Sequence, residues 1–183
     1  YTILDVFSRY VVGWMIAERE SGILAEQLIR ETCEKQGIPH GQLTVHADRG
    51  SSMRSKTVAL LLADLGGTKS HSRPYTSTDN PYSESQFKTM KYRPDYPARF
   101  GCIQDARRWA RSFFHWYNHE HHHTALGLMT PAVVHYGQAE AVIEQRRQVL
   151  QAAYAAHPER FVQGEPKLPS LPQEVWINKP QSP

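Results

Sequence analysis

Leu43-Thr44-Val45-His46-Ala47-Asp48-Arg49-Gly50 is the stretch of sequence that decides the fold. Residues 43–46 have the composition of a short strand, and the chain passes from them into an acidic, glycine-containing turn. A helix is predicted next, because apolar residues recur at helical spacing, namely Val58, Leu61, Leu62 and Leu65. Ligands collect at the carboxyl ends of strands in α/β sheets, so Asp48 is a candidate for chemistry.

The residues before this strand predict a hairpin followed by a helix. Residues 1–7 and 10–17 are rich in β-forming residues, and only Ser8-Arg9 separates them. Residues 22–36 change to helical periodicity, with Glu–Arg and Glu–Lys pairs four residues apart, until glycine and proline end the pattern. A hairpin that opens an alternating order of strands and helices predicts an α/β fold with a mixed sheet flanked by helices.

The residues after this strand predict mostly helices. A short strand at 68–71 and a polar loop at 72–78 lead to Asp79-Asn80-Pro81, which predicts the cap and first turn of a helix running to about Lys91. Further helices are expected over about 104–118, from Thr130-Pro131, and over 139–156. Prolines recur beyond 158, which indicates an extended tail. We therefore predict a core domain over 1–137 and an appended helix with a proline-rich tail over 138–183.

Composition restricts the function only broadly. The 183 residues carry a formal net charge of +3 and a pI of about 8.9, which permits a polyanionic partner. Two cysteines are too few for a disulfide framework or a four-cysteine zinc site, so a reducing cytoplasm is expected. No apolar run is long enough to span a bilayer, so no membrane partner is expected. Tyr1 lies inside a strand-like run, and we expect the true beginning of the protein upstream of it.

Two carboxylates are candidates for catalysis and metal binding. Asp48 closes a strand, Glu84 lies near the start of a helix, and 35 residues lie between them. Lys88 and Lys91 follow Glu84 on one helical face, which suits a metal ion beside a phosphate backbone. Ordinary roles are also open: Asp48 as a turn former, and Glu84 as a helix-terminal acid in a surface pair with Lys88 worth only ~0.3–0.5 kcal/mol.

Several collinear segments resemble the bacterial insertion-sequence transposases that have a retroviral-integrase core. The resemblance runs in the family's order from Tyr1 to about Gly137. It is carried by Leu4-Asp5-Val6-Phe7-Ser8-Arg9, Val12-Gly13-Trp14, His46-Ala47-Asp48-Arg49-Gly50, Ser70-His71-Ser72-Arg73-Pro74, Asp79-Asn80-Pro81-Tyr82-Ser83-Glu84, Trp116-Tyr117-Asn118 and Thr130-Pro131.

The resemblance implies a ribonuclease-H-like fold and a catalytic trio of Asp, Asp and Glu. Asp48 matches the second acid and Glu84 the third, and Lys88 and Lys91 match positions from which the family's last core helix touches DNA. Such a trio holds two Mg²⁺ ions, with Mn²⁺ as the expected substitute, and carries out nicking and strand transfer without ATP. The implied partners are element-end DNA, target DNA and further copies of the chain, in the nucleoid of a bacterial cytoplasm.

One departure from the family concerns the first aspartate. In the family it lies on the strand before the one that contains Asp5, so the resemblance implies that the first strand is missing here. Asp5 matches a strand-end position where a structural role is expected. We therefore expect the 183 residues alone to be inactive. Arg49 and Arg73 lie beside the matched acids and are candidate phosphate ligands, with solvated loop arginines as an equal alternative.

Two other functions remain open. His119-Glu120-His121-His122-His123 satisfies the H-E-x-x-H pattern of zinc peptidases, which requires both histidines on one face of a helix and a third ligand. Here the pattern follows Trp116-Tyr117-Asn118 at a predicted helix end, which favours a histidine-rich loop. The second alternative is an inactive remnant that only binds DNA or partner subunits, and the residues preceding Tyr1 would decide between the remnant and the enzyme.

Overall fold

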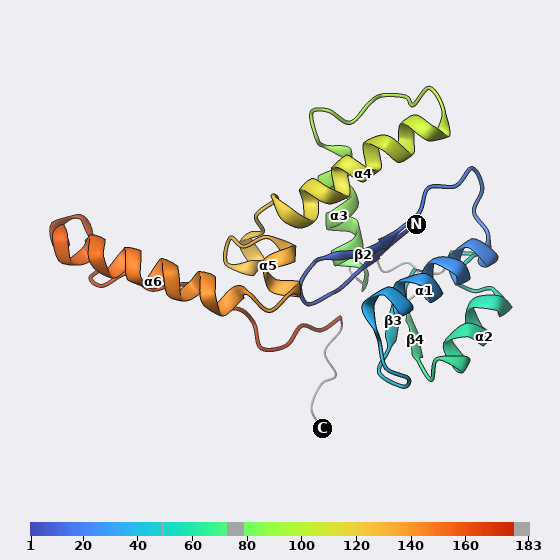
Figure 1. Cartoon of the computed structure of the whole chain (residues 1–183), viewed down its shortest axis with the longest axis horizontal. Helices are drawn as coiled ribbons and strands as arrows, with labels where there is room; N and C mark the ends of the chain where they lie inside the picture. Colours follow the sequence, from blue (N-terminus) through green and yellow to red (C-terminus); the bar gives the residue numbers. More distant parts are fainter. Residues whose placement is uncertain (49, 73–78, 178–183) are drawn as a thin grey trace. The chain divides into compact units, whose positions relative to one another are not determined.

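A computed structural model describes residues 1–48, 50–72 and 79–177. The chain divides into two compact units. Figure 1 labels the helices and strands and colours them along the sequence. Unit 1 contains residues 1–6, 11–114 and the described residues from Trp176 onward. Unit 2 contains residues 7–10 and 115–175. No helix among the described residues is long and apolar enough to cross a membrane.

Unit 1 contains two pairs of strands. β1 (Thr2–Leu4) and β2 (Val11–Trp14) are antiparallel, with Thr2 opposite Trp14. β3 (Thr44–Ala47) and β4 (Thr68–His71) are parallel, with Thr44 opposite Thr68. The α/β class with antiparallel and parallel pairing is confirmed. The strands form two separate sheets within the described residues, whereas one continuous mixed sheet was predicted.

The predicted hairpin is confirmed as the antiparallel pair β1–β2, but its connection is longer than the predicted Ser8-Arg9. β1 ends at Leu4 and β2 begins at Val11, and residues 7–10 between them belong to unit 2. The reason is burial in unit 2: Ser8 is fully buried, and the Tyr10 ring stacks on His135 with centroids 4.4 Å apart. Aromatic packing and burial outweigh the shorter turn that the strand pattern suggested.

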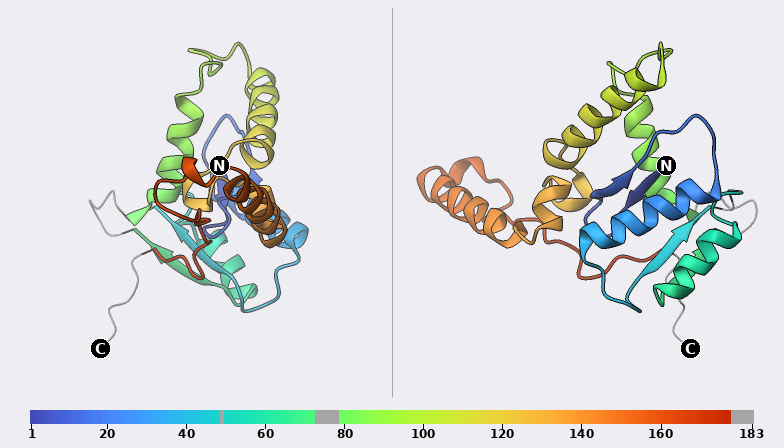
Figure 2. Two further views of the ribbon diagram at one scale, coloured as in Figure 1. Left: turned by 90° about the vertical axis from the view of Figure 1, so that its left-hand side faces the viewer. Right: turned by 45° about the vertical axis from the view of Figure 1, so that its right-hand side comes forward.

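Helices α1 (Gly22–Gln36) and α2 (Lys56–Asp64) build the core of unit 1 and pack against each other (Figure 2). Ser21 and Ser55 cap them through side-chain hydrogen bonds, and Gly37 ends α1 in the left-handed region with φ 60°. The buried core consists of Ala25, Ile29, Cys33, Val58, Leu61 and Leu62. Ile3 of β1 and Val45 of β3 both pack on it, so the two strand pairs share one core.

Two further helices belong wholly or partly to unit 1. α3 (Pro81–Lys91) begins after Asn80 with proline at its first position, as predicted. α4 (Ile103–His119) matches the helix predicted over about 104–118, and on its apolar stripe Trp109 stacks with Phe113 at a centroid distance of 5.2 Å. Phe113 is 1 % exposed and anchors the stripe in the interior.

Unit 2 is helical. It contains the end of α4, η2 (Thr124–Leu126), α5 (Pro131–His135), α6 (Ala139–Ala156) and η3 (Pro158–Arg160). Its core is formed by Leu126, Met129, Val134 and Ala139. The predicted tail has no helix or strand over the described residues 161–177, and its Leu171 packs on this core.

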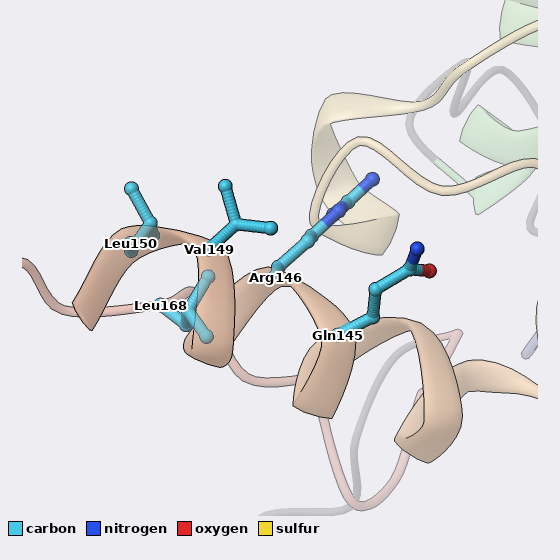
Figure 3. A pocket seen from close by; sticks show the side chains of 5 residues that line it. All are labelled: Gln145, Arg146, Val149, Leu150 and Leu168. Atoms are coloured by element: carbon cyan, nitrogen blue, oxygen red, sulfur yellow. The ribbon is translucent and has the colours of Figure 1, made fainter. Parts of the chain in front are cut away.

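A hollow follows one side of α6. Gln145, Arg146, Val149 and Leu150 line it from the helix, and Leu168 of the tail completes it (Figure 3). The Arg146 guanidinium donates to the backbone oxygens of Gly127 and Leu128, at 2.6 and 2.8 Å. These bonds fasten the polar helix to the loop after η2, a contact that compensates for the helix's weak apolar face.

Candidate functional site

Asp48 follows β3 directly and its side chain is exposed. Its Oδ1 accepts the backbone N–H of Gly50 at 3.1 Å, which closes a local turn on the carboxylate. The Asp48 side chain therefore forms the turn, and the same side chain is the candidate metal ligand. Arg49, the neighbouring candidate phosphate ligand, lies outside the described residues, as does Arg73.

Glu84 is in the first turn of α3, and its backbone N–H donates to Asn80 O at 3.2 Å. Lys88 and Lys91 are in the last turns of the same helix. All three side chains are exposed. The acid at the N-terminal end and the cations at the C-terminal end also suit the helix dipole, which is the ordinary role that the sequence left open.

His46 connects the strand of Asp48 to the helix of Glu84. Its Nε2 lies 2.8 Å from the backbone oxygen of Asp79, a fully buried residue directly before the α3 cap. Its Nδ1 lies 2.7 Å from Ser70 Oγ on β4. A carbonyl oxygen can only accept, so Nε2 carries the proton, and Nδ1 of a neutral ring accepts from the serine hydroxyl.

Sequence reasoning missed this role of His46. Its position two residues before Asp48 was part of the family resemblance, but nothing in the strand pattern indicated which atoms the imidazole would reach. The bond to Asp79 spans 33 positions in the chain and forms only when β3, β4 and the start of α3 come together. A histidine that alternates with apolar residues on a short strand gives no such information.

Glu20, in the connection between β2 and α1, is a third carboxylate near this turn. Its Oε1 accepts the Ser52 hydroxyl at 2.7 Å and the Ser52 backbone N–H at 3.4 Å. The hydroxyl bond is the main cause that lowers the pKa of Glu20 below its usual value. Sequence reasoning gave Glu20 no role, because it lies in a loop without a recognisable spacing to Asp48.

The carboxylates suit magnesium by their chemistry, because Mg²⁺ prefers oxygen ligands. Among the described residues, no group of three or more His, Cys, Asp or Glu side chains is arranged to hold a metal ion.

The histidine-rich segment does not have the zinc-peptidase geometry. α4 ends at His119, and His123 has an extended backbone that pairs with Met129 in an isolated bridge. The two histidines therefore do not share a helical face. The His123 ring packs edge-on against Tyr117 and His121, and burial lowers its pKa to about 4, so it is neutral near pH 7.

Most of the chain is similar in sequence to known proteins. Two family profiles, both described as "Integrase core domain", match residues 1–77 and 65–131. The transposase for insertion sequence element IS904 of Lactococcus lactis subsp. lactis (strain IL1403) is 31% identical over 129 residues. The alignment covers 70% of this chain and 51% of that protein, so the chain spans about half the length of this curated relative.

A solved structure shares the fold. It is a chain in the cryo-EM structure of the simian T-cell lymphotropic virus intasome in complex with PP2A regulatory subunit B56 gamma. The TM-score is 0.55 with 21% sequence identity, over 73% of this chain and 46% of that chain. With both integrase-core matches and the transposase relative, the chain belongs to the family of insertion-sequence transposases that have an integrase-like core.

Proposed function

We propose that this chain supplies Asp48 and Glu84 to a magnesium-dependent site that nicks DNA at the ends of a mobile element and joins the ends to target DNA. The observation that carries the proposal is the His46–Asp79 hydrogen bond. It brings the strand that ends at Asp48 to the residue before the helix of Glu84, although 35 residues separate the two acids. Family membership supports the same chemistry.

Asp48 and Glu84 would hold the metal, Mg²⁺ or Mn²⁺, through their carboxylate oxygens. When bound, a pair of such ions supplies charge stabilisation to the attacking and leaving oxygens of a phosphodiester displacement. His46 keeps the two protein elements in place. Lys88 and Lys91 contact phosphates and neutralise backbone charge, with Arg49 and Arg73 as further candidates.

The proposed fold is a ribonuclease-H-like mixed sheet in which β1–β2 and β3–β4 are neighbours of one additional strand. Support comes from the shared core: Ile3 of β1 and Val45 of β3 pack on the same residues of α1 and α2.

The integrase core is proposed to extend over 1–137, with α6 and the tail of 138–183 as an appendage. The proposed partners are element-end DNA, target DNA and further copies of the chain. Contacts with DNA go mainly to phosphates, so binding weakens as salt rises. The net charge of +3 is compatible with such a surface.

The test is a nicking and strand-transfer assay with the full-length protein and DNA containing an element end. The expected result is cleavage that requires Mg²⁺ or Mn²⁺ and that Asp48→Asn eliminates. A protein that binds the same DNA with normal affinity but nicks it under no metal condition would instead be the inactive, DNA-binding remnant.

A further inference from the structure

The turn that follows Asp48 contacts a carboxylate from a distant part of the chain. Ser52, in the middle of residues 50–55, donates both its hydroxyl and its backbone N–H to Glu20 Oε1. Ser52 is 5% exposed, so Glu20 satisfies two donors that have little access to water. An ionised acceptor makes the shorter of these bonds, at 2.7 Å, a strong one.

Gly50 lies between Glu20 and Asp48. A Cβ atom on Gly50 would lie 3.1 Å from Asp48 Oδ1 and 3.5 Å from Glu20 Oε1. The same Asp48 oxygen accepts the Gly50 N–H. The two carboxylates therefore flank one backbone segment, the one that contains Gly50 and Ser52.

Hydrogen bonds hold the backbone on both sides of Glu20. The Tyr1 hydroxyl accepts the Ser21 N–H at 2.6 Å and donates to the Ser21 carbonyl at 3.1 Å. Ser21 in turn caps α1 by accepting the Leu24 N–H at 3.2 Å. Earlier in the same connection, the Arg107 guanidinium of α4 donates to the Ile16 carbonyl. The connection is a fixed support for the carboxylate and not a free loop.

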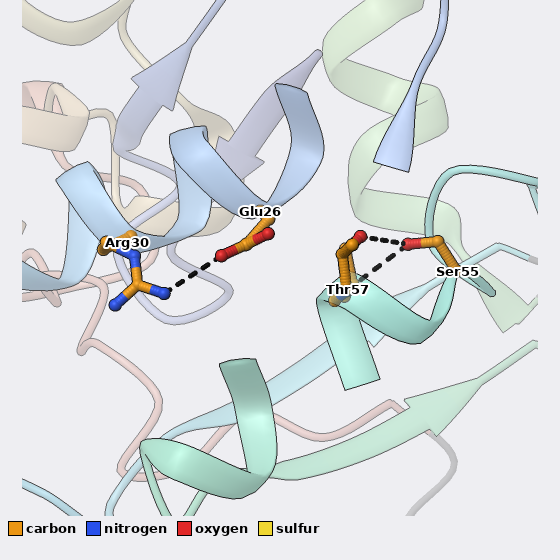
Figure 4. A network of polar contacts seen from close by, with 5 residues as sticks. Glu26, Arg30, Ser55 and Thr57 are labelled. Carbon is orange, nitrogen blue, oxygen red and sulfur yellow. Dashed lines mark hydrogen bonds and ion pairs between the residues drawn. The ribbon is translucent and has the colours of Figure 1, made fainter. Parts of the chain in front are cut away.

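The far end of the turn is fixed against the same helix. A Cβ atom on Gly22, the first residue of α1, would lie 2.4 Å from Ser55 Oγ, so only glycine permits this approach. Ser55 caps α2 and its hydroxyl lies 3.0 Å from Thr57 Oγ1 (Figure 4). On the other side, the Lys69 ammonium of β4 donates to the Met53 carbonyl.

We propose that Glu20 is a positioning residue for Asp48. It holds Ser52, and through the turn it fixes the orientation in which the Asp48 carboxylate meets the metal. This proposal rests on the proposed function of Asp48. A direct ligand role for Glu20 is the alternative, and the Glu20→Gln and Ser52→Ala variants distinguish it from positioning. Groups that orient a ligand typically change metal affinity or activity by about 10–100-fold when removed.

The experiment compares Glu20→Ala, Glu20→Gln and Ser52→Ala in the full-length protein, with Glu18→Ala as the matched control. Glu18 is exposed and two residues away in the same connection, so its removal changes the charge equally. Two quantities are measured: Mn²⁺ affinity by electron paramagnetic resonance, and the Mg²⁺ concentration for half-maximal nicking. Thermal unfolding checks that each variant folds.

Positioning predicts that Glu20→Ala and Ser52→Ala each weaken Mn²⁺ binding and raise the Mg²⁺ requirement by about tenfold. Glu20→Gln should restore most of both, because its amide oxygen still accepts from Ser52. Glu18→Ala should match the wild type. Amide exchange in residues 50–55 should become faster in Glu20→Ala and in Ser52→Ala, and stay unchanged in Glu18→Ala.

Wild-type metal dependence in both Glu20→Ala and Ser52→Ala would overturn the proposal. If Glu20→Gln is as impaired as Glu20→Ala while Ser52→Ala is normal, Glu20 acts through its charge or as a ligand, and positioning is wrong. Asp48→Asn is measured in parallel: if it keeps full metal-dependent nicking, the proposed function of Asp48 fails instead.

Discussion

The two candidate carboxylates are held in different ways. Asp48 lies in a turn that contacts three other parts of unit 1: the connection carrying Glu20, β4 through Lys69, and the N-terminus of α2. Glu84 lies on the exposed side of α3, where the helix backbone itself fixes its position. The orientation of Asp48 therefore depends on distant residues, whereas that of Glu84 depends on where α3 begins.

This difference indicates how the site is assembled. The turn that contains Asp48 contacts several elements. Substitutions at residues far from Asp48 in the sequence should therefore change the orientation of its carboxylate. The start of α3 is held by the long-range hydrogen bond between His46 and Asp79. Substitutions around Glu84 should act locally unless they break that contact.

The largest effect is expected from the carboxylates themselves. Asp48→Asn and Glu84→Gln should each lower the nicking rate of the full-length protein at least about a thousandfold, because each removes charge that holds the metal. The two losses should be similar despite the different surroundings. Asp5→Asn is the control, since Asp5 matches a structural position, and it should keep most of the activity. If Asp5→Asn removes the activity while Asp48→Asn and Glu84→Gln keep it, Asp5 is the catalytic acid and the assignment of Asp48 and Glu84 is wrong.

The next largest effect concerns the core beneath the Asp48 turn. Leu61, 2% exposed on α2, packs with Val58 and Ile29. Leu61→Ala should lower the free energy of unfolding by about 2–5 kcal/mol, measured by denaturant titration. The neighbouring Leu60 is 71% exposed, and Leu60→Ala should change stability by less than about 0.5 kcal/mol. If Leu61→Ala and Leu60→Ala lower the free energy of unfolding equally, the face of α2 that contains Leu61 is not the buried one.

His46→Ala tests the contact between the two regions. It removes the bond to Asp79 and leaves a buried carbonyl without its donor. Nicking at fixed Mg²⁺ should fall about tenfold, with stability reduced by roughly 1–3 kcal/mol. His122→Ala, an exposed histidine of unit 2, should change neither. Normal nicking in a folded His46→Ala variant would mean that α3 is positioned by other contacts.

The smallest effect is expected on α3. Lys88→Ala and Lys91→Ala should each weaken DNA binding about equally for different sequences and reduce the slope of log affinity against log salt by about one. Lys35, also exposed in the last turn of a helix, is the matched control on α1. A salt slope that falls equally for Lys35→Ala would mean that binding senses net charge and not this face of α3.

Local patterns were sufficient to predict most elements of the fold. The helix α2, the start of α3 after Asn80 and the strand β3 follow from spacing and residue type. The segment 7–10 was mispredicted because its residues pack in unit 2, and tertiary burial is invisible to a strand pattern.

The candidate site was predictable only in part. Asp48 and Glu84 were found from their places at element ends and from the family resemblance, and their roles stay predictions. His46 and Glu20 were not found, because their partners Asp79 and Ser52 are 33 and 32 positions away. Such bonds depend on how three or four elements meet, and no residue spacing encodes that.

The central claim is that Asp48 and Glu84 hold the same metal. The most direct measurement is a crystal structure of the full-length protein with Mn²⁺ and element-end DNA, using the anomalous signal to locate the ions. The account predicts an anomalous peak within about 2.1–2.2 Å of a carboxylate oxygen of both Asp48 and Glu84. Ions bound elsewhere, or the two carboxylates facing opposite sides of the sheet, would contradict it.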